Sequence, residues 1–137
     1  MRLRPAVLAV LAAGLAACQP NLSIAPDRHD YAPVLSSVPG LGLSPASRVK
    51  PPAGVRWHWR TDFGQFLRWE PPAYKVEPLG QDVPSAAKVY WTYDPQLMHQ
   101  TKPPVTITLT AEDPGGRPLA AARLRLKWDG DAAELDS

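Results

Sequence analysis

Apolar and polar residues alternate with a period of two from Val55 onward, which is typical of strands that bury one face. Segment 55–61 illustrates the pattern, since one face collects Val55, Trp57, Trp59 and Thr61 and the other collects Arg56, His58 and Arg60. Segment 65–70 follows a turn at 62–64, and we expect it to pair with 55–61 as a hairpin.

The clearest pair of strands lies further along the chain. Apolar residues occupy every second position of segments 105–110 and 122–128, with threonines between them in the first and mostly basic residues in the second. In the turn between them, Asp113 can accept hydrogen bonds from nearby backbone, and Gly115 and Gly116 tolerate a positive φ. These features predict a second hairpin.

Two more segments, 74–77 and 87–93, bring the predicted strands to five or six, with Val89, Trp91 and Tyr93 on one face. Prolines and glycines separate the strands, and no amphipathic helix of useful length occurs. We therefore expect an all-β fold, a small sandwich or barrel of about six strands.

Residues 18–52 differ from the rest, because prolines recur about every six residues and no regular period is present. Such prolines obstruct helices and sheet ladders. We expect a proline-rich tether over 18–52, with a reach of about 30 Å as a coil and roughly 100 Å when extended, ahead of a β domain over 53–137. Val34-Leu35 and 41–43 are the apolar positions expected to contact that domain. The alternative is a peptide ligand for a proline-binding partner.

Residues 1–17 have the layout of a secretory signal peptide, with Arg2 and Arg4 before an apolar run that is too short to span a bilayer. Leu15-Ala16-Ala17-Cys18 then resembles the lipobox of bacterial lipoproteins. Over residues 1–18, this resemblance implies cleavage before Cys18, a diacylglycerol on its sulfur, and acylation, for example by palmitate, of the new N-terminus. Otherwise Cys18 would be a free thiol behind an ordinary signal.

The lipobox resemblance also implies a location. Two or more acyl chains anchor a protein stably, whereas one gives only marginal binding. The membrane of a bacterial cell envelope is therefore the expected partner of the N-terminal lipid. In such lipoproteins an Asp after the cysteine tends to mark inner-membrane retention, so Gln19 favours the outer membrane where one exists.

The second hairpin resembles the opening of a bacterial immunoglobulin-like domain of the invasin/intimin type (Big-1). Those domains run a threonine-rich strand into Asp-x-x-Gly-x-Pro-x-x-x-Ala, and Asp113, Gly116, Pro118 and Ala122 match that spacing. The resemblance implies an immunoglobulin-like β-sandwich. Such domains normally continue for several more strands, which leaves three explanations open. The strands over 55–93 complete the sandwich in another order, the likeness is convergent turn chemistry, or an unpaired edge accepts a strand from another chain.

Charge and cysteine content narrow the classes of function. The 137 residues carry 15 Lys and Arg against 13 Asp and Glu, and removal of Arg2 and Arg4 leaves 13 of each sign. A near-neutral mature chain does not favour a nucleic-acid partner, which usually needs a clustered basic face. Lipidation of Cys18, the single cysteine, leaves none for a disulfide, a metal site or a nucleophile.

No motif predicts catalysis, a metal site or a cofactor. His29, His58 and His99 lack a second histidine or carboxylate at zinc-ligand spacing, and the common hydrolase, metalloprotease and nucleotide-binding motifs do not occur. We expect His58 to be solvated or to pair with a carboxylate such as Glu70. The acidic residues over 129–136 lack the spacing of a calcium loop and are expected to form a solvated tail.

Five tryptophans and four tyrosines permit two interpretations. Exposed coplanar rings would form a platform for the sugar rings of envelope glycans. If all of them were exposed, however, too little apolar surface would remain to hold a small domain together. We expect most of these rings in the core, with Trp69 and Tyr90 as surface exceptions that contact a glycan or a partner.

These observations predict a lipid-anchored, non-catalytic structural or protein-interaction module of the bacterial cell envelope. Its expected partners are the membrane, through the lipid, and another envelope protein, with no nucleic acid. The alternative is an envelope glycan-binding module that uses surface aromatics. Fold class alone does not choose between them.

Overall fold

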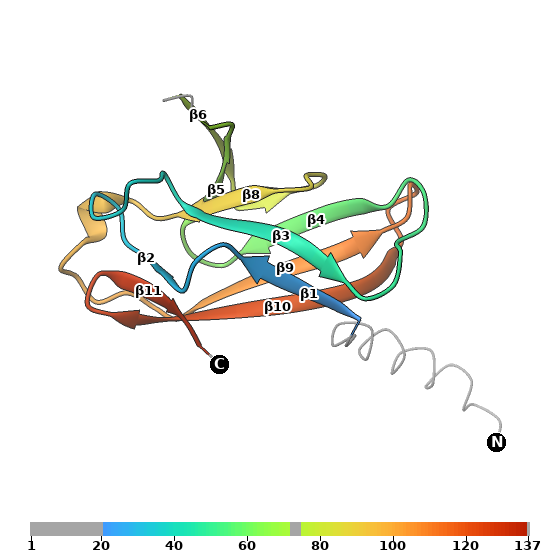
Figure 1. Cartoon of the computed structure of the whole chain (residues 1–137). Helices are drawn as coiled ribbons and strands as arrows, with labels where there is room; N and C mark the ends of the chain where they lie inside the picture. Colours follow the sequence, from blue (N-terminus) through green and yellow to red (C-terminus); the bar gives the residue numbers. More distant parts are fainter. Residues whose placement is uncertain (1–20, 72–74, 137) are drawn as a thin grey trace, which may run out of the picture.

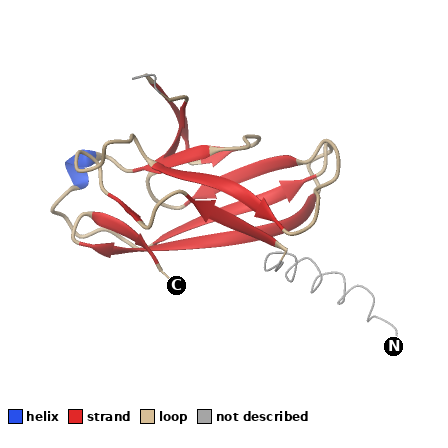
Figure 2. Ribbon diagram, viewed as in Figure 1, coloured by secondary structure: helices blue, strands red, loops and turns tan. Residues whose placement is uncertain are grey.

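A computed structural model describes residues 21–71 and 75–136, which form two antiparallel sheets packed face to face (Figure 1). The described strands are β1 (Leu22–Pro26), β2 (Asp30–Tyr31), β3 (Leu41–Ser47), β4 (Arg56–Thr61), β5 (Gln65–Trp69), β6 (Val76–Gly80), β7 (Asp82–Val83), β8 (Val89–Thr92), β9 (Val105–Glu112), β10 (Pro118–Asp129) and β11 (Ala132–Leu135). One short 3-10 helix, η1 (Pro95–Leu97), interrupts them (Figure 2).

The strand order is β1-β3-β8-β5-β6 in the five-stranded sheet and β2-β11-β10-β9-β4-β7 in the six-stranded sheet. The predicted all-β sandwich is therefore confirmed, although it contains more than the expected six or so strands.

Large aromatic side chains fill the space between the sheets. Trp59, Phe66 and Trp91 are 0% exposed, and Tyr93 is 1% exposed. Each buried indole donates a hydrogen bond to a backbone carbonyl, from Trp59 Nε1 to Ala86 at 2.8 Å and from Trp91 Nε1 to Phe63 at 2.9 Å. Because the N–H groups are satisfied, these rings can be buried without a polar penalty. The inward face predicted for 89–93 is confirmed.

The expectation of a tether over 18–52 is wrong for the described part of that range. Leu22–Pro26 and Leu41–Ser47 are paired strands of the sandwich, and Leu41 and Leu43 are fully buried. The prolines fit because β1 is an edge strand, and Pro45 lies beyond the part of β3 that pairs with β8. A missing N–H costs little where no neighbouring strand needs it.

The predicted hairpin between 55–61 and 65–70 is also wrong. β4 pairs with β7 and β9, whereas β5 pairs with β6 and β8 in the opposite sheet. Residues 62–64 therefore cross between the sheets. Gly64 has a φ of 77°, and a Cβ there would lie 2.4 Å from the Thr92 carbonyl oxygen. Only glycine allows the chain to turn this close to β8.

The predicted second hairpin is confirmed as β9 and β10, and the turn between them has the expected chemistry. The order runs β11-β10-β9-β4, but β11 pairs only with Leu126–Asp129 of β10. Among the described residues, the side of β10 away from β9 has no strand partner over 118–124, so the explanation in which an unpaired edge accepts a strand from another chain stays a prediction. Segments before and after the hairpin complete its sheet.

Candidate functional site

The sandwich has two ends with different chemistry. We call the first the Asn21 end; it contains Asn21, loop 48–55 and turn 113–117. We call the second the Lys102 end; it contains connection 94–104 and the turn at 130–131. Connection 32–40 lies there too, because Tyr31 pairs with Ala133. The twelve residues of β10 run between the ends, a distance of about 40 Å in an extended strand.

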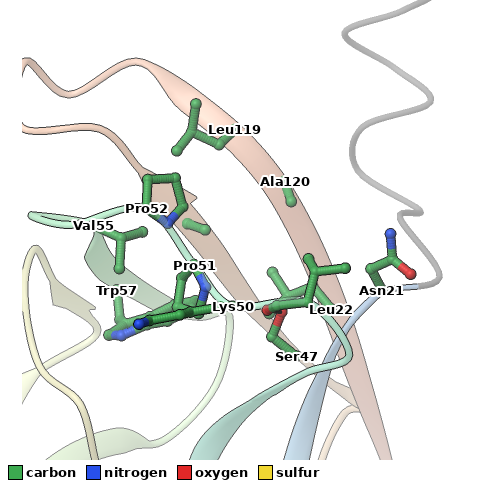
Figure 3. A pocket seen from close by; sticks show the side chains of 12 residues that line it. Asn21, Leu22, Ser47, Lys50, Pro51, Pro52, Val55, Trp57, Leu119 and Ala120 are labelled. Carbon is green, nitrogen blue, oxygen red and sulfur yellow. Dashed lines mark hydrogen bonds between the residues drawn. The ribbon is translucent and has the colours of Figure 1, made fainter.

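An apolar cavity of about 260 Å³ opens at the Asn21 end (Figure 3). It lies where β1, β4 and β10 begin and where β3 ends. The side chains that line it are Asn21, Leu22, Ser47, Val49, Lys50, Pro51, Pro52, Val55, Trp57, Ala111, Leu119 and Ala120. The cavity can accept an apolar group but offers few hydrogen-bonding partners.

The rim of this cavity carries exposed apolar and basic side chains. Val49 is 56% exposed and Leu119 is 41% exposed. Arg48 and Lys50 flank Val49, are also exposed, and form no ion pair within the described part of the chain. Exposed apolar tips beside free cations mark this end as a candidate contact surface.

Turn 113–117 closes the Asn21 end and holds its own carboxylate. Asp113 Oδ1 accepts hydrogen bonds from the backbone N–H of Arg117 at 2.8 Å and of Gly115 at 2.9 Å. These bonds, led by that from Arg117, hold the pKa of Asp113 below its usual value, and the Arg117 guanidinium adds to the effect. Asp113 therefore stays ionised, and its charge is paired with Arg117, whose Nε lies 3.3 Å from Asp113 Oδ2.

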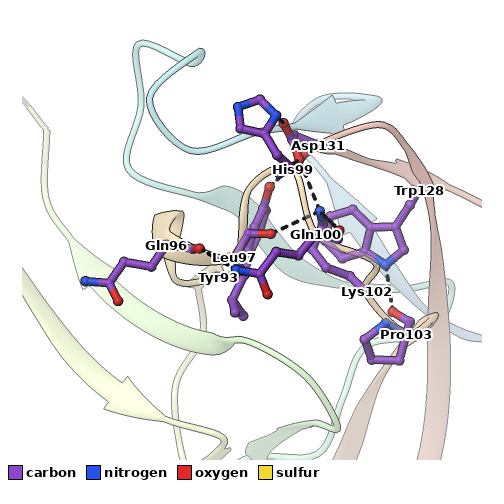
Figure 4. A network of polar contacts seen from close by, with 9 residues as sticks. All are labelled: Tyr93, Gln96, Leu97, His99, Gln100, Lys102, Pro103, Trp128 and Asp131. Carbon is purple, nitrogen blue, oxygen red and sulfur yellow. Dashed lines mark hydrogen bonds and ion pairs between the residues drawn. The ribbon is translucent and has the colours of Figure 1, made fainter.

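The Lys102 end is fastened around a buried lysine (Figure 4). The Lys102 side chain is 2% exposed, and its Nζ lies 3.1 Å from Asp131 Oδ1. The same ammonium donates to the Gln100 carbonyl at 2.8 Å and lies 4.8 Å from the centre of the Trp128 ring. A buried cation needs such partners, and here they tie connection 94–104 to the β10–β11 turn.

Asp131 is the second centre of this network. It accepts a hydrogen bond from the backbone N–H of His99 at 2.6 Å, and this bond is the main reason its pKa is lowered, with Lys102 contributing further. Its carbonyl accepts from the Tyr93 hydroxyl at 2.7 Å. Burial raises the pKa of Tyr93 to about 12. The expected solvated tail over 129–136 is therefore wrong, since Asp131 is internal to this network and Ala132–Leu135 form β11.

Val34 and Leu35 project from the same end. They are 80% and 75% exposed, so the expectation that they contact the domain is wrong. Val34 also has a φ of 72°, a conformation that β-branched residues rarely adopt. The sequence singled out this pair, because two adjacent large apolar residues are unusual in a stretch otherwise rich in Pro and Ser, but it did not distinguish burial from exposure.

His58 lies on the outer face of the six-stranded sheet and bridges two carboxylates. Its Nδ1 lies 2.9 Å from Glu112 Oε2 on β9, and its Nε2 contacts Asp82 Oδ1 on β7. The contact with His58 is the main cause of a lowered pKa at Asp82. A carboxylate partner was expected, but the proposed one, Glu70, is wrong because β5 belongs to the other sheet. These contacts link β4 to β7 and β9 on the outer face of the sheet.

Of the two aromatics expected at the surface, Trp69 is half-buried and Tyr90 is only 5% exposed. Their rings contact each other edge to face at 5.3 Å, and the Lys88 ammonium lies 5.1 Å from the Tyr90 ring. The expected exposure of Tyr90 is therefore wrong, because Trp69 and Lys88 cover it. A glycan or partner contact by these two residues stays a prediction.

Cys18 and the signal segment 1–17 lie outside the described residues. Within 21–71 and 75–136, no helix combines the length and apolar character needed to cross a membrane. In the same residues, no group of three or more His, Cys, Asp or Glu side chains is arranged to hold a metal ion.

Comparisons of the chain with models of known protein families, with curated proteins and with solved structures found no match. The lipobox and the immunoglobulin-like resemblances therefore stay predictions from the residues that carry them.

Proposed function

We propose that this chain is a lipid-anchored, non-catalytic interaction module of the bacterial cell envelope. Cys18 carries the lipid, and the Lys102 end contacts another envelope protein. The observation that carries the proposal is the start of the fold, because β1 begins at Leu22, four residues after Cys18. A rigid sandwich that begins this close to an acylated residue is held against the membrane by one end and presents the other. In a cell with two membranes, Gln19 favours the outer one.

The partner contact is supported by the chemistry of the Lys102 end. Val34 and Leu35 are adjacent, apolar and largely exposed, and Val34 is held in a strained backbone conformation. Strain of this kind costs about 1–3 kcal/mol and is common at binding sites. The fastening of connection 94–104 by Lys102 gives the surroundings a fixed shape, which favours specific contact over loose association.

The anchor is tested by metabolic labelling with an alkyne analogue of palmitate. The full chain, expressed with its signal segment, should take up the label and fractionate with membranes. Cys18→Ser should do neither, and should accumulate unlabelled. If the unmodified chain remains unlabelled while a known lipoprotein in the same culture is labelled, the proposal is wrong.

The partner contact is tested by photo-cross-linking in cells from a residue incorporated at Leu35. One discrete cross-linked product is expected. The matched control places the cross-linker at Arg123, an exposed position on the outer face of β10. The same product from both positions, or none from Leu35, would contradict a contact at the Lys102 end.

A further inference from the structure

We propose that the Asn21 end is a lipid-contact face. In the anchored protein, Val49, Leu119 and the apolar cavity between them rest in the headgroup region of an anionic bilayer. This inference deepens the proposed function and rests on lipidation of Cys18. It assigns a bilayer surface as the partner of an end of the fold for which the sequence predicted a long spacer instead.

The first step is the distance between the lipid and the fold. Only Gln19 and Pro20 lie between Cys18 and Asn21, and covalent geometry limits the three Cα–Cα steps from Cys18 to Asn21 to about 11 Å however the chain is arranged. The predicted spacer would have allowed the domain to stand about 30 Å or more away. With β1 starting at Leu22, the domain cannot leave the bilayer surface, and Asn21 must stay beside it.

The second step is the chemistry that this geometry brings to the surface. Loop 48–55 and the start of β10 surround Asn21, and they carry two exposed apolar residues that line the cavity, Val49 and Leu119. Figure 3 shows Leu119 together with other lining residues. The free energy falls when apolar side chains of this kind enter the boundary between headgroups and acyl chains. The cavity adds apolar surface that otherwise faces water.

The third step is charge. Arg48 and Lys50 are exposed on either side of Val49 and form no ion pair within the described residues. On the neighbouring turn, Arg117 is paired with Asp113 at 3.3 Å, and Glu112 contacts His58, so Arg48 and Lys50 supply the unpaired positive charge of the rim. Anionic headgroups attract basic residues that lie within a Debye length, so the rim complements such a surface.

Exposure alone does not single out this end, because the Lys102 end exposes Val34 and Leu35 to a greater degree. What distinguishes the Asn21 end is its covalent proximity to the lipid, combined with basic residues around the apolar ones. The two ends therefore provide a matched pair of exposed leucines for a test, Leu119 and Leu35.

The experiment measures the depth of each end in vesicles of phosphatidylethanolamine and phosphatidylglycerol. Once Cys18 is lipidated, a cysteine introduced by Leu119→Cys or by Leu35→Cys is the only thiol, and each is labelled with the same environment-sensitive dye. Lipids that carry a quencher on the acyl chain should reduce emission from position 119 about twofold and leave position 35 nearly unchanged. Equal quenching at both positions, or none at position 119, overturns the inference.

A second pair of variants tests the role of charge. Arg48→Glu with Lys50→Glu should reduce the quenching at position 119 about twofold. The matched control, Arg123→Glu with Arg125→Glu, changes two exposed arginines on the outer face of β10 and should leave the quenching unchanged. If both pairs act alike, general charge repulsion explains the signal and the inference is wrong.

The intact mass of the purified protein separates the two levels of the argument. A mass that includes the diacylglycerol, together with no quenching at position 119, overturns the lipid-contact face alone. A mass with a free thiol at Cys18 overturns the proposed function, and the inference with it.

Discussion

At the Lys102 end, polar side chains fasten the connections to a buried charge, whereas the Asn21 end closes over an apolar cavity with a basic rim. Lys102 and Asp131 join connection 94–104 to the β10–β11 turn, and Trp128 and Tyr93 pack over the ammonium. At the other end, Val49 and Leu119 edge a space that no side chain fills. The Lys102 end is held in a fixed shape by these contacts. At the Asn21 end, an apolar surface placed against the unfilled space would make favourable contacts with the side chains that line it.

The difference has a chemical basis that bears on recognition. A protein partner selects a fixed arrangement of side chains, so a fixed end suits it. A bilayer is fluid and selects apolar area and charge, so shape matters less there.

Trp91→Ala should give the largest loss of stability, because Trp91 is fully buried and packs against Tyr93 and Trp128 toward the Lys102 end. We expect the free energy of unfolding to fall by about 4 kcal/mol. The matched control is Trp57→Ala, since Trp57 is half-buried beside the existing cavity, and a loss of about 1–2 kcal/mol is expected. Urea unfolding followed by circular dichroism measures both, and equal losses would remove the contrast between a filled and an unfilled end.

Acid should weaken both ends through carboxylates whose pKa is lowered by folding. A lowered pKa stabilises the folded state at pH values above the ordinary value of 3.8, and this stabilisation is lost as the pH falls below 3.8 toward the folded value. Asp131→Asn and Asp113→Asn should each reduce the stability lost on acidification.

The two variants should differ at neutral pH. Asp131→Asn removes the charge that faces buried Lys102, so it should destabilise the protein at pH 7 as well. Asp113→Asn keeps a side-chain oxygen that can accept from the turn, so it should have little effect there. Thermal unfolding at several pH values measures this, and an identical profile for the two variants would contradict the description of the Lys102 end.

Val34→Asn should stabilise the protein by about 1 kcal/mol, because asparagine tolerates a positive φ better than a β-branched residue does. Little packing is lost, since Val34 is 80% exposed. Leu35→Asn is the control and should bring no gain. If Val34→Asn stabilises the fold and also abolishes cross-linking from position 35, the strained conformation of Val34 is needed for the partner contact.

Ala120→Leu should give the smallest effect, a gain of about 0.5 kcal/mol, because Ala120 lines the cavity at the Asn21 end and the larger side chain fills part of it. Ala121→Leu, on the opposite face of β10, is the control and should leave the free energy of unfolding unchanged. A loss on Ala120→Leu would mean that the cavity walls cannot accept an apolar group. Chemical denaturation of both variants, measured side by side, gives the difference in their free energies of unfolding.

Part of the candidate site could be predicted from the sequence and part could not. The Asp113 turn was predicted because its contacts span only four residues, and local hydrogen bonds follow local sequence. Nothing in the local sequence singles out Lys102, because its partner Asp131 lies 29 residues away. His58 was expected to be solvated or to pair with a carboxylate such as Glu70, whereas β9 brings Glu112 alongside it from 54 residues away.

The tether shows why a composition-based prediction fails. Leu22 and Ile24 alternate with Ser23 and Ala25, which is a strand pattern, but the surrounding prolines favoured an extended linker. Proline excludes a residue from one hydrogen-bonded side of a ladder, not from the ladder as a whole. Only the position of β1 at an edge, and of Pro45 beyond the pairing with β8, shows that these prolines are compatible with strands.

Local sequence was enough to predict the all-β class, the inward faces of segments 55–61, 89–93, 105–110 and 122–128, and the β9–β10 turn. Alternation with a period of two and local turn hydrogen bonds depend on neighbours within a few residues, so they are visible before the chain folds. The sequence did not predict which sheet each strand joins, that residues 22–47 belong to the fold, or that a buried cation and an apolar cavity occupy opposite ends. Those outcomes depend on contacts between distant segments, which hydrophobic burial selects for the molecule as a whole.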